Sequence, residues 1–148
     1  MNYKYPRPVI TCDVALFCVK DRKPHLLLIK RGKDPFAGYY ALPGGHLEMD
    51  EELEDCALRE LEEETSIGED LIAIIRQIKA IGTRGRDPRD RYVTVLYGAL
   101  ADPTAFNQAV AGDDAADHKW VPVYEVEQMN LAFDHKELCE EGIRWFGS

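Results

Sequence analysis

An unusually acidic predicted helix is the feature that most constrains how this 148-residue chain can fold. Between residues 51 and 65, apolar side chains recur every four residues from Leu53 to Leu61, which predicts a helix with one buried face. The same segment carries eight acids and a single base, Arg59. Acids suit the first turn of a helix, where they face the positive end of its dipole, and we expect Asp50 to cap that end.

The acids in the second half of this helix oppose its formation unless something neutralises them. Carboxylates near a helix C-terminus face the negative end of the dipole, and like charges three or four residues apart repel by about 0.2–0.5 kcal/mol per pair. Glu60, Glu63 and Glu64 have this spacing and project from one face, whereas Glu62 points elsewhere. The three aligned carboxylates are candidate ligands for Mg²⁺ or Mn²⁺, which prefer oxygen donors. The alternative is an ordinary solvated acidic face.

Two adjacent glycines, Gly44 and Gly45, come shortly before this helix. Because glycine has no side chain, the main chain there can approach a ligand or metal closely and present a carbonyl group to it. A glycine pair alone is weak evidence. Followed by a helix with three aligned carboxylates, it favours a metal site over a plain acidic surface.

The rest of the chain alternates between predicted strands and loops and ends in a helix. Apolar β-branched runs favour strands, and segments rich in Pro, Gly and charge favour loops. Asp134, with Glu137 three residues later, predicts a capping box at the start of the C-terminal helix. The predicted strands are 9–19, 25–30, 39–42, 71–81, 92–100 and 120–124, and the predicted loops include 31–38, 44–50, 84–91 and 101–116. This mixed order indicates an α/β or α+β class.

Composition limits the classes of function. With 18 Lys and Arg against 27 Asp and Glu, the net charge of -9 argues against a dedicated nucleic-acid binder. The chain has the length of one domain, residues 1–148, and shows no apolar run of membrane-spanning length and no signal peptide, so we expect a cytoplasmic protein without a membrane partner. The four cysteines are scattered and are expected to be core residues in a reducing compartment.

Residues 45–67 resemble the Nudix box, which reads glycine, five residues, Glu, seven residues, then Arg-Glu-aliphatic-x-Glu-Glu-x-Gly-aliphatic. Eight of its nine defined positions are present, at Gly45, Glu51, Arg59, Glu60, Leu61, Glu63, Glu64 and Ile67. The departure is Ser66, where the family has a glycine that ends the helix. This change affects the helix end and removes no ligand. The resemblance implies a Nudix-fold α/β/α sandwich with a mixed β-sheet.

The resemblance also implies a metal-dependent reaction, because Nudix hydrolases cleave a nucleoside diphosphate linked to another moiety. By resemblance, Glu60, Glu63 and Glu64 bind the catalytic Mg²⁺ or Mn²⁺, and a carbonyl group of Gly44 or Gly45 assists. Bound metal ions neutralise phosphate charge, orient the substrate and lower the pKa of a bound water.

Two further catalytic roles follow from the family pattern. Glu51 is expected to pair with Arg59 and so brace the loop against the helix, whereas without the motif Glu51 would be an ordinary acid at a helix start. A carboxylate must take the proton from the attacking water, and the sequence leaves open which one does so. The candidates are Glu63, Glu64 and the later acids Asp113, Asp114 and Asp117.

Less specific similarities point to the branch of the family tied to NAD metabolism, which includes ADP-ribose pyrophosphatases and Nudix-type regulators. They lie in residues 5–8, 28–32, 35–38, 86–89, 112–115 and 132–135, although Gly82 stands where many ADP-ribose hydrolases have proline. The implied reaction is hydrolysis of ADP-ribose to AMP and ribose 5-phosphate by a homodimer. Alternatives are a nucleoside diphosphate sugar, a dinucleotide, an oxidised nucleoside triphosphate, or a non-catalytic ADP-ribose sensor. Such regulators carry an extra DNA-binding domain, for which we expect no room after Ser148.

Basic and aromatic residues are candidates to bind this small nucleotide. Four arginines within residues 84–91 are placed to receive an anion, or form a solvated hairpin tip. The aromatic residues between 36 and 40 are candidates to stack on an adenine, or are core and rim residues. His46 follows the glycines and is a candidate phosphate contact or a structural histidine, and His135 is expected in the first turn of the last helix. The predicted substrate-binding set is Arg31, Phe36, Tyr40, His46, Arg86 and Arg89.

Overall fold

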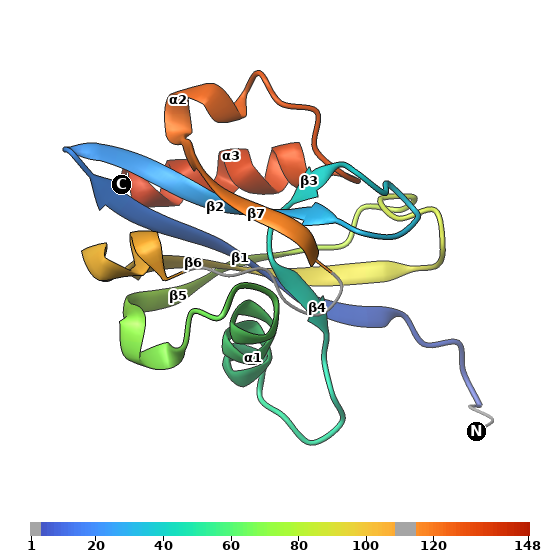
Figure 1. Ribbon diagram of the computed structural model, residues 1–148. Coiled ribbons are helices and arrows are strands. Elements are labelled where there is room, and N and C mark those ends of the chain that lie inside the picture. Colours follow the sequence, from blue (N-terminus) through green and yellow to red (C-terminus); the bar gives the residue numbers. More distant parts are fainter. Residues whose placement is uncertain (1–3, 109–114) are drawn as a thin grey trace.

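Seven strands form one mixed sheet with helices on both faces (Figure 1). The structure, a computed structural model, describes residues 4–108 and 115–148. The strands are β1 (Val9–Lys20), β2 (Lys23–Arg31), β3 (Tyr40–Ala41), β4 (Gly44–His46), β5 (Ile72–Ile81), β6 (Tyr92–Ala101) and β7 (Ala115–Pro122). The helices are α1 (Leu53–Thr65), α2 (Val123–Val126) and α3 (His135–Phe146), with short 3₁₀ turns η1 (Glu69–Leu71) and η2 (Pro103–Asn107). The expected α/β sandwich with a mixed sheet is confirmed.

The long strand β1 organises the sheet by pairing with three partners. It runs parallel to β6 from Val9 to Phe17, and antiparallel to β4 over residues 11–13 and to β2 over residues 17–20. The sheet order is β3-β2-β1-β6-β5, with β7 added to β2. Because β4 and β2 take different stretches of the same edge of β1, the sheet forks between Asp13 and Phe17. This fork positions the site described below.

The core has two layers because side chains of β1 alternate between the two faces of the sheet. Val14 and Leu16 pack in the cluster under α1, while Ala15 and Phe17 pack in the cluster under α3. All four cysteines are buried, as expected for core residues. No helix within residues 4–108 and 115–148 is long and apolar enough to span a membrane.

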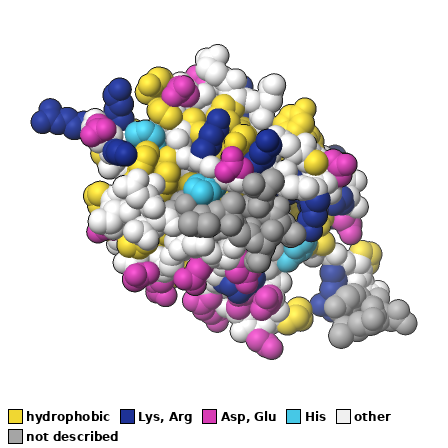
Figure 2. All heavy atoms as spheres, viewed as in Figure 1, with side chains coloured by type: hydrophobic (Ala, Val, Ile, Leu, Met, Phe, Trp, Pro, Cys, Tyr) yellow, Lys and Arg dark blue, Asp and Glu magenta, His cyan; other side chains and the backbone are white. Residues whose placement is uncertain are grey.

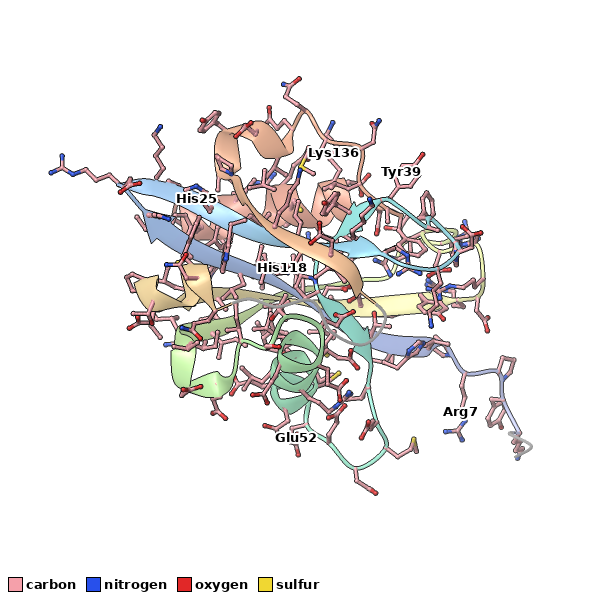
Figure 3. The ribbon with its side chains drawn as sticks, in the orientation of Figure 1. Arg7, His25, Tyr39, Glu52, His118 and Lys136 are labelled. Atoms are coloured by element: carbon pink, nitrogen blue, oxygen red, sulfur yellow. The ribbon has the colours of Figure 1, made fainter. Side chains whose placement is uncertain are left out.

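Helix α1 has the predicted apolar face but begins later than expected. The predicted cap Asp50 is wrong, because the residue at the N-cap position is Glu52, which Figure 3 shows at the outer side of the helix start. No side chain caps this end. The neighbouring Glu51 side chain does not cap the helix either, and it accepts a hydrogen bond from the backbone N–H of Glu48. At the other end, Ser66 is left-handed with φ 66°, the conformation for which the family uses glycine.

The predicted capping box at the C-terminal helix is also wrong. Asp134 occupies the N-cap position of α3, but its side chain makes no capping hydrogen bond. Both of its carboxylate oxygens accept from Arg86, which lies in the β5–β6 loop. A charged donor competes better for this carboxylate than a backbone N–H does. A tertiary contact therefore replaced the local one.

Three predicted segments differ from the secondary structure that is observed. Gly44–His46 is a strand, not a loop, because it pairs with β1. The expected strand over residues 120–124 ends at Pro122 and continues as the helix Val123–Val126. The expected loop over 101–116 contains η2 and the first residues of β7. The other predicted strands are confirmed within a few residues.

Candidate active site

A cleft of about 280 Å³ opens at the fork of the sheet. Its walls come from both arms of the fork, from α1, from the β5–β6 loop and from the start of α3. The cleft thus collects residues that are far apart in the chain. Those predicted from sequence that line it are Arg31, Gly44, Gly45, His46, Glu60, Glu63, Glu64, Arg86 and Arg89.

Two of the three aligned carboxylates are held against the glycine pair. Glu64, which is buried, accepts a 2.7 Å hydrogen bond from the backbone N–H of Gly44. The Glu60 carboxylate lies so close to Gly45 that a Cβ there would overlap it. Burial raises the pKa of Glu60 above its ordinary value, and the Arg59 guanidinium opposes this rise only in part. The lack of a side chain at Gly45 therefore lets the Glu60 carboxylate lie against the main chain, and the backbone angle there is ordinary.

The expected Glu51–Arg59 pair is present and forms the back of this wall. Arg59 donates from Nε to Glu51 Oε2 at 3.0 Å and from Nη2 to Glu51 Oε1 at 2.7 Å. These hydrogen bonds lower the pKa of Glu51 to about 2. Nη2 also donates to the carbonyl oxygen of His46 at 2.9 Å, so Arg59 ties the helix to β4. Neither Glu51 nor Arg59 lines the cleft in the described residues, which agrees with a bracing role.

Arg59 also reaches the candidate metal ligands. Its Nη1 lies 2.7 Å from Glu60 Oε1 and 3.2 Å from Glu63 Oε2. Figure 2 shows acidic side chains gathered over α1. Arg59 is the one basic residue in the sequence of this helix, Leu53–Thr65. With Arg59 so placed, no three His, Cys, Asp or Glu side chains of the described residues converge into a formed metal site.

The donor set nevertheless fits a divalent cation such as Mg²⁺ or Mn²⁺. Glu60, Glu63 and Glu64 offer only oxygen atoms, and all three line one cleft. Glu60 and Glu64 are anchored at the glycine pair, while the Glu63 side chain is 43% exposed and attached only to Arg59 among described partners. Such a carboxylate can exchange a surface ion pair for a metal at little cost.

Two of the four arginines of the β5–β6 loop, Arg86 and Arg89, line the cleft, and each is paired with an aspartate. Arg86 donates to Asp134 from Nε at 2.9 Å and from Nη2 at 2.8 Å. Arg89 donates to Asp87 from Nε at 3.0 Å and from Nη2 at 2.7 Å. Burial by itself would raise the pKa of Asp87, but the hydrogen bonds from Arg89 hold it below its ordinary value. Within the expected cationic patch, the two arginines that line the cleft are thus locally neutralised.

Several cleft residues were not predicted from the sequence. Asp13 is buried on β1 and accepts a 2.6 Å hydrogen bond from the Thr94 hydroxyl. An acid inside an otherwise apolar strand was the available signal for it. His135 is also buried and accepts through Nδ1 from the backbone N–H of Leu42 at 3.0 Å. Burial lowers the pKa of His135, so it is held neutral as an acceptor. The other lining residues without a prediction include Thr11, Lys33, Asp87, Tyr92 and Phe133.

The predicted aromatic residues lie beside the cleft instead of in its wall. Within the described chain, neither Phe36 nor Tyr40 lines it, and Tyr39 projects beside β3 with 44% exposure (Figure 3). Tyr92 and Phe133 line the wall instead, and the Phe36 ring lies 4.8 Å from the Phe133 ring between centroids. The sequence offered no periodic signal for Phe133, which has a left-handed φ of 52° in the turn before α3.

The later acids do not supply a general base within the part of the chain that is described. Asp113 and Asp114 lie outside the described residues. Asp117 is exposed on β7, opposite Lys30 of β2, and is absent from the described lining of the cleft. Glu63 and Glu64 are the candidate bases that line it.

The chain matches known proteins over most of its length. A family model described as NUDIX domain matches residues 11–142. The ADPR responsive transcriptional repressor NtrR of Acinetobacter baylyi is 39% identical over 94% of this chain and 54% of its own length. An ADP-ribose pyrophosphatase of Methanocaldococcus jannaschii is 32% identical over 95% of this chain and 76% of its own. The chain therefore spans about half the length of the repressor.

A solved structure gives the same picture of the fold. The NUDIX domain of Shewanella oneidensis NrtR, complexed with ADP ribose, has a TM-score of 0.86 and 34% identity, over 98% of this chain and 94% of that one. NrtR from the same organism, complexed with a 27mer DNA, has a TM-score of 0.79 and 37% identity, but this chain covers only 61% of it.

Proposed function

Because the chain belongs to the Nudix family, we propose that it is a divalent-metal-dependent hydrolase that converts ADP-ribose to AMP and ribose 5-phosphate. One observation carries this proposal. Glu60, Glu63 and Glu64 line the same cleft as Gly44 and Gly45, so the residues of the family motif come together where a nucleotide can enter. The pyrophosphatase relative and the ADP-ribose-bound neighbour support the choice of substrate.

The chain's own residues would position the reactants. Glu60, Glu63 and Glu64 are the proposed holders of Mg²⁺ or Mn²⁺, which when bound neutralises diphosphate charge and lowers the pKa of water. Arg59 holds the helix against β4 through the carbonyl oxygen of His46, and this keeps the carboxylates beside the glycine pair. Water attacks one phosphorus of the diphosphate, and the bond from that phosphorus to the bridging oxygen breaks.

A carboxylate accepts the proton from the attacking water. Glu64 is buried and oriented by the Gly44 N–H, while Glu63 is more exposed and bound to Arg59. Both are proposed bases. The pH dependence of kcat in Glu64→Gln tests Glu64, because loss of the base removes the acidic limb of the profile.

The proposal is tested by incubating the protein with Mg²⁺ or Mn²⁺ and a substrate panel led by ADP-ribose. Products are followed by chromatography. AMP and ribose 5-phosphate should form with the wild type and with Glu62→Gln, whose side chain lies outside the described lining of the cleft. They should not form with Glu63→Gln. Turnover of a nucleoside diphosphate sugar, a dinucleotide or an oxidised nucleoside triphosphate, but not of ADP-ribose, would refute the substrate.

A second candidate is an ADP-ribose sensor, because the repressor NtrR shares 39% identity with this chain. The sequence-based prediction of no nucleic-acid partner is not confirmed, since the similar NrtR was solved with DNA. Tight ADP-ribose binding without turnover in the assay above would favour the sensor. A gel-shift titration then tests DNA binding, for which the charge of -9 predicts weak affinity.

Three further expectations stay predictions. We propose that residues 1–148 form one Nudix hydrolase domain and that the protein is a homodimer, which sedimentation analysis tests. The cytoplasmic location inferred from the sequence also stays a prediction, and fractionation of cells tests it.

A further inference from the structure

We propose that the paired residues Arg86–Asp134 and Arg89–Asp87 form a subsite for sugar hydroxyl groups, and not for phosphate. This inference rests on the proposed function, because it names the part of the same nucleotide that the β5–β6 loop would recognise. It departs from the sequence-based expectation that these arginines receive the anionic charge. The shared chemistry is a vicinal diol, which occurs both on the nucleoside ribose and on the terminal ribose.

The first observation is that each arginine is already neutralised. Arg86 and Arg89 each spend Nε and Nη2 on two oxygens of one aspartate, at 2.7–3.0 Å. The Arg86–Asp134 pair is largely buried, with side-chain exposures of 5% and 13%. A phosphate entering here would meet the Asp87 carboxylate, which also lines the cleft. A neutral ligand meets no such repulsion.

The second observation is that donors remain. A guanidinium has five N–H donors, and side-on pairing with a carboxylate leaves those on Nη1. Within the described residues, Nη1 of Arg86 and of Arg89 makes no hydrogen bond, and neither atom is among the buried atoms without a partner. Both arginines line the cleft, so a ligand in the cleft would meet their side chains.

The third observation is that the subsite offers acceptors beside its donors. The Asp87 carboxylate is 4% exposed and belongs to the cleft wall. A hydroxyl group both donates and accepts, whereas a fully ionised phosphate only accepts. An arginine with an adjacent carboxylate can therefore donate to one hydroxyl group of a diol and accept from the other.

The fourth observation is that two aromatic rings flank Arg89. Its guanidinium lies 4.9 Å from the Tyr92 ring centroid and 5.4 Å from that of Phe133. Tyr92 in turn meets His46, the residue after Gly45, with 3.3 Å between its hydroxyl and Nε2. These contacts connect Arg89 through Tyr92 to the segment of Gly45 and His46, beside which the Glu60 carboxylate lies.

The test compares three ligands that share one non-hydrolysable core, each titrated calorimetrically with Mg²⁺ present. They are the α,β-methylene analogues of ADP-ribose and of ADP, and methylenediphosphonate, which has no sugar. The variants are Asp87→Asn and Arg86→Lys. The control is Arg84→Lys, because Arg84 lies exposed on the same loop and outside the described lining. Melting curves confirm that each variant is folded.

We expect Asp87→Asn and Arg86→Lys to weaken binding of the ADP-ribose analogue about tenfold to a hundredfold, as for loss of hydrogen bonds to charged groups. Methylenediphosphonate binding should not change. Loss confined to the ADP-ribose analogue assigns the terminal ribose, and loss shared with the ADP analogue assigns the nucleoside ribose.

Other results would overturn the subsite. If the arginines bind phosphate, Asp87→Asn removes a negative charge and all three ligands bind more tightly. If no ligand responds to either variant, the pairs are structural. The proposed function can fail separately from the subsite. If the wild type binds the ADP-ribose analogue as expected but does not hydrolyse ADP-ribose, the subsite is supported and the hydrolase proposal is refuted.

Discussion

Arg59 donates to both carboxylate oxygens of Glu51, at 3.0 and 2.7 Å, and the same side chain reaches the His46 carbonyl oxygen at 2.9 Å. One base thus joins the loop before α1, the helix itself and β4. We expect Arg59→Ala to lower the free energy of unfolding by about 1.5–3 kcal/mol, as for loss of charged hydrogen bonds. Activity should fall with it. Urea denaturation measures the first effect, and an unchanged midpoint would show that the bracing role is wrong.

The proposed metal-binding role of the α1 carboxylates predicts a metal-dependent shift in melting temperature. Adding Mg²⁺ or Mn²⁺ at about 100 times its Kd should stabilise the wild type by about 2.7 kcal/mol. Glu60→Gln should lose most of this shift, and Glu62→Gln should keep it. Thermal melts with and without metal measure this shift in melting temperature. An equal shift in Glu60→Gln and Glu62→Gln would show that the cation binds elsewhere.

Gly45→Ala should impair the metal response and turnover by displacing the Glu60 carboxylate. A Cβ at Gly45 would overlap the Glu60 carboxylate, so the carboxylate must move away from β4. We expect the metal-dependent shift and turnover to fall by at least about tenfold, as for disturbed support of metal ligands. Gly82→Ala is the matched control, since its Cβ would meet only ordinary contacts at 3.4 Å and beyond. Equal activity of the two variants would contradict the close packing at Gly45.

Ser66→Gly should stabilise the protein. Ser66 has a φ of 66°, and the left-handed conformation costs a residue with a side chain roughly 1–2 kcal/mol. Glycine adopts it freely, so we expect a gain of up to about 1 kcal/mol after its larger loss of chain entropy. Ser66→Ala has the same strain and should gain nothing. A lower melting temperature for Ser66→Gly than for Ser66→Ala would refute this account.

His135 predicts a dependence of stability on pH. Burial lowers its pKa in the folded state, while Asp13 and Asp134 raise it in part and Arg86 and Arg31 lower it further. A depressed pKa means that the stability is complete above the unfolded value of about 6.5 and is lost as the pH falls below it. Protonation also removes the Nδ1 acceptor for the Leu42 N–H. His135→Gln should remove this slope between pH 6.5 and 5, measured by denaturation at each pH.

The strands and helix α1 could be predicted because their signals are local. The apolar run in β1 and the four-residue spacing around Leu61 reflect which side chains must be buried, and both elements formed where expected. The Nudix-box residues were also identified from the sequence, through their resemblance to the family motif. Their convergence on one cleft follows, because helix geometry places Glu60, Glu63 and Glu64 on one face.

The sequence by itself therefore indicated the family and the acidic helix, and it predicted a cation site on that helix. The tertiary structure decided which charges cancel. Asp134 looked like a helix cap and instead pairs with Arg86, 48 residues away. Phe133 entered the cleft wall in place of Phe36 and Tyr40. The physical reason is that hydrogen bonds between distant segments depend on the path of the chain around the forked sheet, and local propensity does not encode that path.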